Sequence, residues 1–161
     1  VYETPVGFKF IGELISEDKI VIGGEESAGM SIKGHVPEKD GILACLLALE
    51  MVCREGISLR RQLARLFEKT GKVLTRRVNI SLTDKLKERL NEKLALGPES
   101  FAGHKVVQTI KLDGHKYVLD DGSWLLMRLS GTEPVVRLYV EANSADDLTA
   151  LSKEGERFIT K

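Results

Sequence analysis

Two strand-like segments meet at a short polar loop in the stretch Arg128-Leu129-Ser130-Gly131-Thr132-Glu133-Pro134-Val135-Val136-Arg137. The segment before the loop, Trp124–Leu129, is almost entirely apolar, as a buried strand would be. The segment after it, Val135–Glu141, alternates apolar and polar residues, which is typical of a half-buried strand. Ser, Gly and Thr between two such segments favour a tight turn, so the sequence predicts two neighbouring antiparallel strands here.

The surrounding sequence predicts that this hairpin belongs to a small α+β domain. Asp-Gly pairs at 113–114 and 121–122 are strong turn signals between the neighbouring strand candidates. Thr83 and Ser144 are suitable N-caps for two helices. The expected order is strand, helix, four strands and helix, which indicates an antiparallel sheet with its helices on one face. The expected elements are strands at Arg77–Leu82, Val106–Leu112, Tyr117–Leu119, Trp124–Leu129 and Val135–Glu141, and helices at 84–96 and 144–159.

The first half of the chain reads as part of an α/β domain, with a boundary expected near Thr70-Gly71. A β-branched strand, Lys19–Gly23, leads into the loop Gly24-Glu25-Glu26-Ser27-Ala28-Gly29. A helix is expected to begin after Pro37 and to end before Gly56, and a second one runs from Ser58 to about Thr70. Because the first helix is apolar nearly all round between Ile42 and Leu49, we expect it to be buried on most faces.

Composition excludes several classes of protein. Twenty-four basic residues balance twenty-four acidic ones, and this neutrality argues against a nucleic-acid-binding protein. The longest apolar run, Ile42–Leu49, is too short to cross a membrane. Cys45 and Cys53 have neither disulfide-framework nor zinc-site spacing and are expected to be small core residues in a cytoplasmic protein. The three histidines have no metal-ligand spacing either.

The loop between Arg128 and Arg137 has the chemistry of a phosphate site. Ser130 and Thr132 offer hydroxyl donors, and Gly131 would let the backbone turn so that successive N–H groups converge on an anion. Arginine forks bind phosphate oxygens well. The residues alone leave open that this is a plain hairpin turn with two surface arginines.

The Gly-rich loop and Lys39 are the second pair of candidates. Glu25 and Ser27 could bind a polyol, because a carboxylate that accepts from two sugar hydroxyls discriminates against analogues that lack them. The positive end of the helix dipole disfavours a cation at Lys39, which suits proton transfer or anion binding. A solvated acidic loop, and a lysine paired with Glu38 or Asp40, are the simpler interpretations.

Taken together and in this order, these motifs closely resemble the α-D-phosphohexomutase family, which includes phosphoglucomutases and phosphomannomutases. The resemblance covers essentially the whole chain. It is carried by Gly24-Glu25-Glu26-Ser27, Gly34-His35, Glu38-Lys39-Asp40-Gly41, the stretch Arg128–Arg137 and the opening Thr4-Pro5-Val6-Gly7-Phe8-Lys9.

The resemblance implies a four-domain parent enzyme that moves phosphate between O1 and O6 of a hexose through a phosphoserine and a hexose 1,6-bisphosphate. Residues 1–70 would be the C-terminal part of its sugar-binding third domain, a truncated three-layer α/β/α domain. Residues 71–161 would be its phosphate-binding fourth domain. The serine and the Mg²⁺ loop of the family would lie in missing N-terminal domains that contact this chain. We therefore expect no metal ligands here and no activity from the chain alone.

The resemblance also assigns roles to individual residues. It implies sugar contacts for Glu25, Ser27 and Gly7, and substrate contact or proton transfer for Lys39. The implied phosphate ligands are Arg128, Ser130, Gly131, Thr132 and Arg137.

Hexose phosphates are the expected ligands. Many relatives that act on mannose or glucosamine have Gly-His where this chain has Ala28-Gly29, and this difference favours glucose. A phosphomannomutase and a non-catalytic sugar-phosphate-binding module remain the alternatives.

Overall fold

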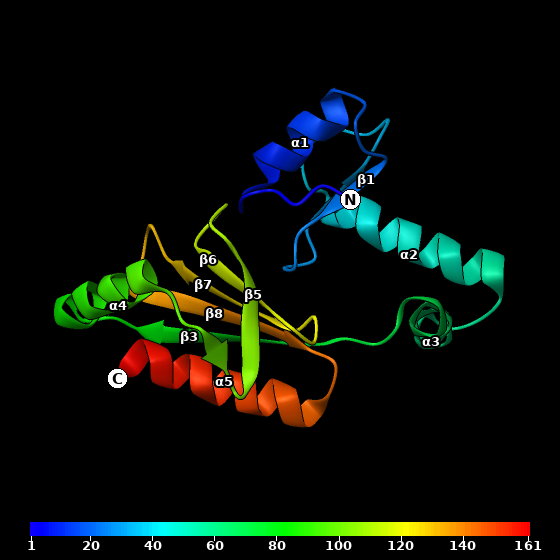
Figure 1. Cartoon of the computed structure of the whole chain (residues 1–161). Coiled ribbons are helices and arrows are strands. Elements are labelled where there is room, and N and C mark those ends of the chain that lie inside the picture. The colour runs from blue at the N-terminus through cyan, green and yellow to red at the C-terminus, as the bar shows by residue number, and fades with distance from the viewer. The chain divides into compact units, whose positions relative to one another are not determined.

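The computed structural model describes residues 1–161 and divides into two units, Val1–Gly71 and Lys72–Lys161 (Figure 1). The first unit contains α1 (Phe8–Ser16), β1 (Ile22–Gly24), β2 (Met30–Ile32), α2 (Gly41–Glu55) and α3 (Leu59–Thr70). The second contains β3 (Leu74–Ser81), α4 (Asp84–Leu96), β4 (Ser100–Phe101), β5 (His104–Ile110), β6 (His115–Leu119), β7 (Trp124–Leu129), β8 (Val135–Ala142) and α5 (Ala145–Thr160).

The strands of the second unit form one antiparallel sheet in the order β3-β8-β7-β6-β5-β4. The predicted α+β domain is therefore confirmed. The two-residue strand β4 was not predicted, because two residues are too short to produce an alternating pattern. Thr83 and Ser144 cap α4 and α5, as predicted, by accepting backbone N–H groups of the first helical turn.

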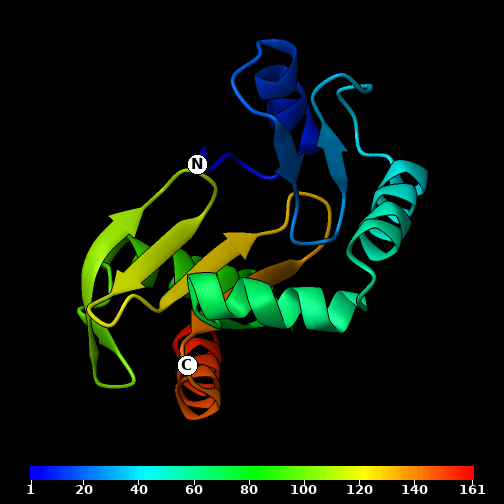
Figure 2. The same ribbon diagram turned by 90° about the vertical axis from the view of Figure 1, so that its right-hand side faces the viewer.

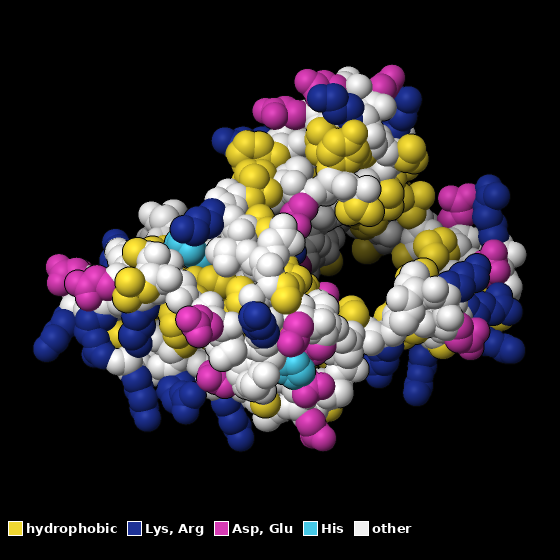
Figure 3. Space-filling view, in the orientation of Figure 1, with side chains coloured by type: hydrophobic (Ala, Val, Ile, Leu, Met, Phe, Trp, Pro, Cys, Tyr) yellow, Lys and Arg dark blue, Asp and Glu magenta, His cyan; other side chains and the backbone are white.

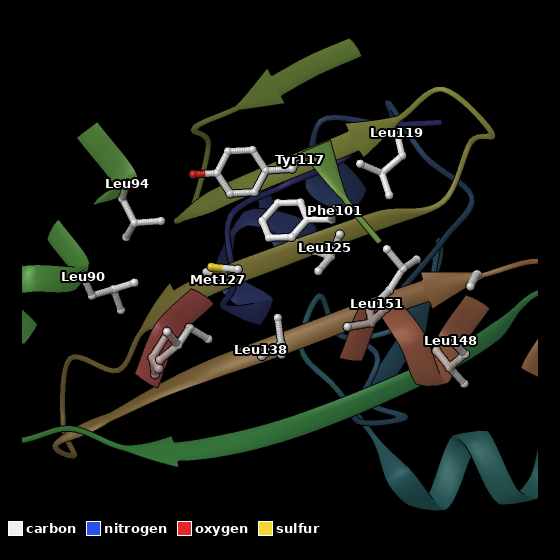
Figure 4. Close-up of a cluster of buried hydrophobic side chains, with 14 residues drawn as sticks. Leu90, Leu94, Phe101, Tyr117, Leu119, Leu125, Met127, Leu138, Leu148 and Leu151 are labelled. Atoms are coloured by element: carbon white, nitrogen blue, oxygen red, sulfur yellow. The ribbon is translucent and has the colours of Figure 1, made fainter. Parts of the chain in front are cut away.

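Alternation along the central strands places one set of side chains on the core face of the sheet. Along β8, every second residue from Val136 to Ala142 is buried. Leu125 and Met127 on β7 and Tyr117 on β6 are buried too, and leucines of both α4 and α5 belong to the same cluster (Figure 4). Both helices therefore cover the same face, as expected, and the other face carries the residues whose numbers are even on β7 and odd on β8. The buried set comprises Leu90, Leu94, Phe101, Tyr117, Leu119, Leu125, Met127, Val136, Leu138, Val140, Ala142, Leu148, Leu151 and Ile159.

In the first unit, β1 and β2 form an antiparallel hairpin that packs beside α1 (Figure 2). This unit is an α/β arrangement with a single strand pair, as expected of a partial domain. The strand begins at Ile22 rather than at the predicted Lys19, because Lys19 N–H bonds Leu14 O in the turn that ends α1. Ile20 then packs on the apolar cluster of α1.

Two glycines let the neighbouring backbone approach α1 closely. A Cβ at Gly12 would lie 2.3 Å from Pro37 O, and one at Gly23 would lie 2.2 Å from Ile11 Cγ2. Both distances are far shorter than real carbon contacts, so α1 is wedged between the hairpin and the loop before α2 at positions that only glycine permits.

Helix α2 ends at Glu55, as predicted, but it begins at Gly41 and not directly after Pro37, because Asp40 is its N-cap. The prediction that it is buried is wrong. No residue of α2 is buried, and both cysteines are exposed. Apolar side chains also gather at the surface around β1 and the N-terminal part of α2 (Figure 3). The reason is that α2 packs mainly on β2 and α3 of its unit, which leaves much of its surface uncovered. No helix in the structure has the length and apolarity needed to span a membrane.

We expect Tyr117→Phe to stabilise the chain. Tyr117 is fully buried, its hydroxyl has no hydrogen-bond partner, and burial raises its pKa to about 12. An unpaired buried hydroxyl costs roughly 1–3 kcal/mol, so its removal should raise the free energy of unfolding by about 1 kcal/mol in urea titrations at neutral pH.

Two further measurements make this test specific. Between about pH 10 and 12 the wild type should lose stability, because its unfolded tyrosine releases a proton that the folded one keeps, and the Phe variant should lose less. The matched control Tyr139→Phe, half-exposed on the other sheet face, should change little. A destabilised Tyr117→Phe variant would contradict an unpaired hydroxyl.

Candidate functional site

In the second unit the two predicted arginines face each other across neighbouring strands. Arg128 on β7 is the direct register partner of Arg137 on β8, and both lie on the sheet face opposite the core. Like charges directly opposite each other are unfavourable in a sheet. The pair therefore costs stability, and it concentrates positive charge beside the loop that joins the two strands.

Each arginine has its own carboxylate partner, and the two partners differ. Arg128 Nε lies 3.0 Å from Asp113 Oδ2, and Arg137 Nη2 donates to Glu133 Oε2 at 3.1 Å. The Asp113 side chain is 30% exposed, whereas that of Glu133 is 61% exposed. Asp113 and Glu133 were not among the predicted site residues. The Asp-Gly turn signalled a hairpin, but nothing in its sequence indicated a contact with β7.

The loop between the arginines is an exposed turn organised by Ser130. Ser130 N–H bonds Val135 O at 2.9 Å, which closes the hairpin. The backbone N–H groups of Thr132 and Glu133 point to Ser130 Oγ at 3.4 and 3.3 Å, and Thr132 Oγ1 lies 3.5 Å from the same oxygen. These are long, weak bonds. Two backbone N–H groups and the Thr132 hydroxyl thus gather around Ser130 Oγ, and an oxyanion that replaced this oxygen as their acceptor could take these weak bonds.

The structure corrects the reason given for Gly131. Its φ is not among the positive values that favour glycine, so the turn does not require glycine for its backbone conformation. A Cβ there would meet nothing within 4 Å. What Gly131 contributes is open space at the tip of the loop.

In the first unit the predicted sugar loop is the turn of the β1–β2 hairpin. Glu25 N–H bonds Gly29 O at 2.8 Å and Ala28 N–H bonds Glu25 O at 3.0 Å. Ala28 has φ of 71°, a left-handed conformation that a non-glycine residue adopts at a cost. Ser27 is exposed at the turn, and the Glu25 side chain is only 19% exposed.

The segment before α2 brings Lys39 to this loop. Ser31 Oγ donates to Val36 O at 2.7 Å and Asp40 N–H bonds Met30 O at 3.2 Å, so the segment folds back along β2. Lys39 Nζ consequently lies 3.9 Å from Glu25 Oε2. Gly29 makes room for this pair, since a Cβ there would lie 3.1 Å from Lys39 Cδ.

Gly7 and Asp40 complete this region. Gly7 has φ of 131° at the start of α1, a conformation that favours glycine, and Lys39 Nζ stands 6.0 Å from the ring of the adjacent Phe8. Asp40 caps α2, and the N–H of Leu43 and the side chain of His35 lower the pKa of its carboxyl. Lys39 therefore lies just outside a helix whose first turn is already capped by a carboxylate.

The fold brings His104, Asp120 and Asp121 together in a cluster that the spacing of the histidines did not predict. His104 Nδ1 lies 3.4 Å from Asp120 Oδ1 and 3.8 Å from Asp121 Oδ2, at turns of the second unit. Burial acts to raise the pKa of Asp121, but hydrogen bonds from Ser123 outweigh it and hold that pKa low. These residues are at the sheet end away from the Ser130 loop, because Asp121 precedes β7 and the loop follows it.

Neither candidate loop has the donor set that Mg²⁺ prefers. Magnesium takes oxygen ligands in octahedral geometry and is repelled by cations. The Ser130 loop is flanked by arginines, and the partly buried carboxylate of Glu25 faces Lys39.

Comparison with known proteins matches both units to one family. A family model described as phosphoglucomutase/phosphomannomutase, alpha/beta/alpha domain III, matches residues 1–70. A second, described as phosphoglucomutase/phosphomannomutase, C-terminal domain, matches residues 78–156.

The individual relatives are named for different sugar substrates. A phosphoglucomutase of Rhizobium radiobacter is 34% identical over 91% of this chain, and a probable phosphoglucosamine mutase of Pyrococcus horikoshii is 32% identical over 99%. A crystal structure of a putative phosphomannomutase from Thermus thermophilus is 34% identical, with a TM-score of 0.77 over 98% of this chain. The chain spans about a third of the length of these proteins: 31%, 34% and 31% respectively.

We expect Gly12→Ala to disrupt the first unit. The added methyl would meet a backbone carbonyl that the fold cannot easily move, and such overpacking costs about 1–3 kcal/mol. Pro37 should shift, and Lys39 with it. The variant should unfold at a lower temperature than the wild type, and the NMR amide signals of residues 25–29 should shift.

Gly41→Ala is the matched control, because Gly41 has nothing within 4 Å and begins a helix, where alanine is favoured. This variant should be as stable as the wild type or more so. If both variants behave alike, the close approach at Gly12 does not organise the unit.

Proposed function

Because the chain belongs to the phosphoglucomutase/phosphomannomutase family, we propose that it supplies sugar and phosphate binding to a phosphohexomutase. In this proposal residues 1–70 form part of the sugar-binding domain and residues 71–161 form the phosphate-binding domain. The parent enzyme interconverts hexose 1-phosphate and hexose 6-phosphate through a phosphoserine and a bisphosphorylated sugar.

The observation that carries the proposal is the cross-strand pair Arg128–Arg137 beside the Ser130 loop. Two guanidinium groups and converging N–H and O–H donors make a site that recognises phosphate oxygens but offers nothing specific to a sugar ring. A mutase needs such a holder, because the phosphate that is not reacting belongs first to one end of the hexose and then to the other. Holding it at one place keeps the reacting end positioned.

Glu25, Ser27, Lys39 and Gly7 are the proposed sugar contacts. The Glu25 carboxylate can accept from two ring hydroxyls, and a substrate that lacks one of them leaves it with an unpaired acceptor. Lys39 Nζ, 3.9 Å away, is close enough to share a hydroxyl with Glu25 and to donate to it. We propose glucose as the preferred sugar, with mannose as the alternative.

In this proposal the ligands of the metal lie outside this chain. Mg²⁺ assists the transfer in the parent enzyme by neutralising phosphoryl charge, and its ligands belong to other parts of that enzyme. This chain alone is then without mutase activity, and its own role is to bind and orient the hexose phosphate. A free-standing sugar-phosphate-binding module would have the same two loops but no catalytic parent.

We expect inorganic phosphate to bind the full 161-residue chain at the Ser130 loop. In an NMR titration at constant ionic strength, the amide signals of Ser130, Gly131 and Thr132 should move first. Arg137→Ala should weaken binding about tenfold or more, since a hydrogen bond to a charged group contributes roughly 1.5–3 kcal/mol. Arg76→Ala is the charge-matched control, because Arg76 lies on β3 opposite Val140, well away from the loop.

A chloride control and the Arg76 variant distinguish the Ser130 loop from other anion sites. Chloride at the same ionic strength should leave the loop signals in place, because screening alone does not reproduce oxyanion geometry. Shifts confined to the first unit, or equal losses in Arg76→Ala and Arg137→Ala, would contradict the proposed phosphate site.

Neutralising Glu133 should strengthen phosphate binding. Its exposed carboxylate occupies Arg137 Nη2, an atom that a phosphate would use, so the anion must displace it. An exposed ion pair contributes only about 0.2–1 kcal/mol, so Glu133→Gln should tighten binding by about two- to fivefold. Glu88→Gln on α4 removes the same charge elsewhere and should have a smaller effect. Weaker binding by Glu133→Gln would mean that the carboxylate supports the loop instead of competing.

A further inference from the structure

Arg128 is held in place by a carboxylate that reaches it from a different hairpin. The turn between β5 and β6 places Asp113 Oδ2 3.0 Å from Arg128 Nε. The Nε atom is shielded from solvent and makes no well-aligned hydrogen bond. The attraction of the Asp113 carboxylate therefore compensates the burial of Nε. Only 18% of the Arg128 side chain is exposed.

The turn itself is fixed against β7 by the residue after Asp113. Gly114 has φ of 96°, and a Cβ there would lie 2.6 Å from Met127 O and 3.1 Å from the Cα of Arg128. Only glycine allows this conformation and this approach together. The position of Asp113 relative to Arg128 is thus set by backbone contact and does not depend on a long flexible side chain.

The geometry points to Asp113 as a positioning residue for phosphate binding, which rests on the proposed phosphate site. By pairing with Nε, Asp113 restricts the positions that the guanidinium can adopt and leaves its two Nη groups for the anion. A guanidinium fork binds oxyanions through paired, parallel N–H bonds, so a restricted guanidinium loses less freedom on binding. Asp113 acts through Arg128 and does not itself touch the phosphate.

This role differs from that of Glu133 in the sign of its effect. Any carboxylate near a phosphate repels it, so simple electrostatics predicts that neutralising Asp113 would strengthen binding. Glu133 is exposed and pairs with an Nη group of Arg137, so we expect its neutralisation to strengthen phosphate binding. Asp113 is less exposed and occupies Nε, so the loss of orientation should outweigh the loss of repulsion.

The test is a double-mutant cycle on the full chain with inorganic phosphate as the probe. The loop amide signals are followed by NMR in the wild type, Asp113→Asn, Arg128→Ala and the double variant. We expect Asp113→Asn to weaken phosphate binding by about fivefold in the wild-type background and by less than about twofold once Arg128 is absent. The Arg128 Nε–H signal should also shift and exchange faster with solvent in Asp113→Asn.

Asp146→Asn is the charge-matched control, because Asp146 lies in the first turn of α5, next to the opposite end of β8. It should leave loop binding unchanged. Three results would overturn the inference: unchanged or tighter binding by Asp113→Asn, equal weakening in both backgrounds, or an unaltered Nε–H signal. A wild-type loop that does not respond to phosphate at all would instead refute the proposed phosphate site, and the inference with it.

Discussion

The pairing register between β7 and β8 is the constraint on which the second unit depends. Successive side chains of a strand point to opposite faces, so the register that sends Leu125 and Met127 into the core also sends Arg128 to the other face, opposite Arg137. A slip of one residue in either strand would bury an arginine and expose a leucine. Packing against α4 and α5 therefore fixes the two arginines of the proposed phosphate site, although both helices lie on the other face of the sheet.

The first unit solves a similar problem with close backbone contacts, because it has too little sheet to impose a register. Gly12 and Gly23 let α1 approach the segment before α2 and the hairpin at the same time. That arrangement holds Lys39 within reach of Glu25. A pair 3.9 Å apart is weak in itself when one partner, here Lys39, is largely exposed, and such pairs contribute about 1 kcal/mol or less. Its position is therefore set by the surrounding backbone more than by the attraction between the two charges.

Local signals in the sequence predicted most of the elements and missed what depends on distant residues. Helix α4 and strand β7 have their predicted bounds, because a cap or a turn residue marks their ends. The burial of α2 could not be read from its own pattern, since burial depends on what other segments cover it. The contact of Asp113 with Arg128 was equally hidden, because the Asp-Gly turn signals only a reversal of the chain. Residue chemistry, together with the resemblance to a family, supplied the candidate site residues, but not the carboxylates that pair with them in the structure.

Unequal counterions give the two arginines different tasks in the proposed holder. A mutase must bind the non-reacting phosphate firmly enough to orient the sugar and loosely enough for the bisphosphate to turn round. In the proposal Arg128, paired with a partly buried carboxylate, would supply orientation in every step. Arg137 is paired with the exposed Glu133, which would offset part of the attraction and take over the guanidinium when the phosphate leaves. Two equally free arginines would bind with greater loss of side-chain entropy, and two uncompensated ones would repel each other across the strands whenever the site is empty.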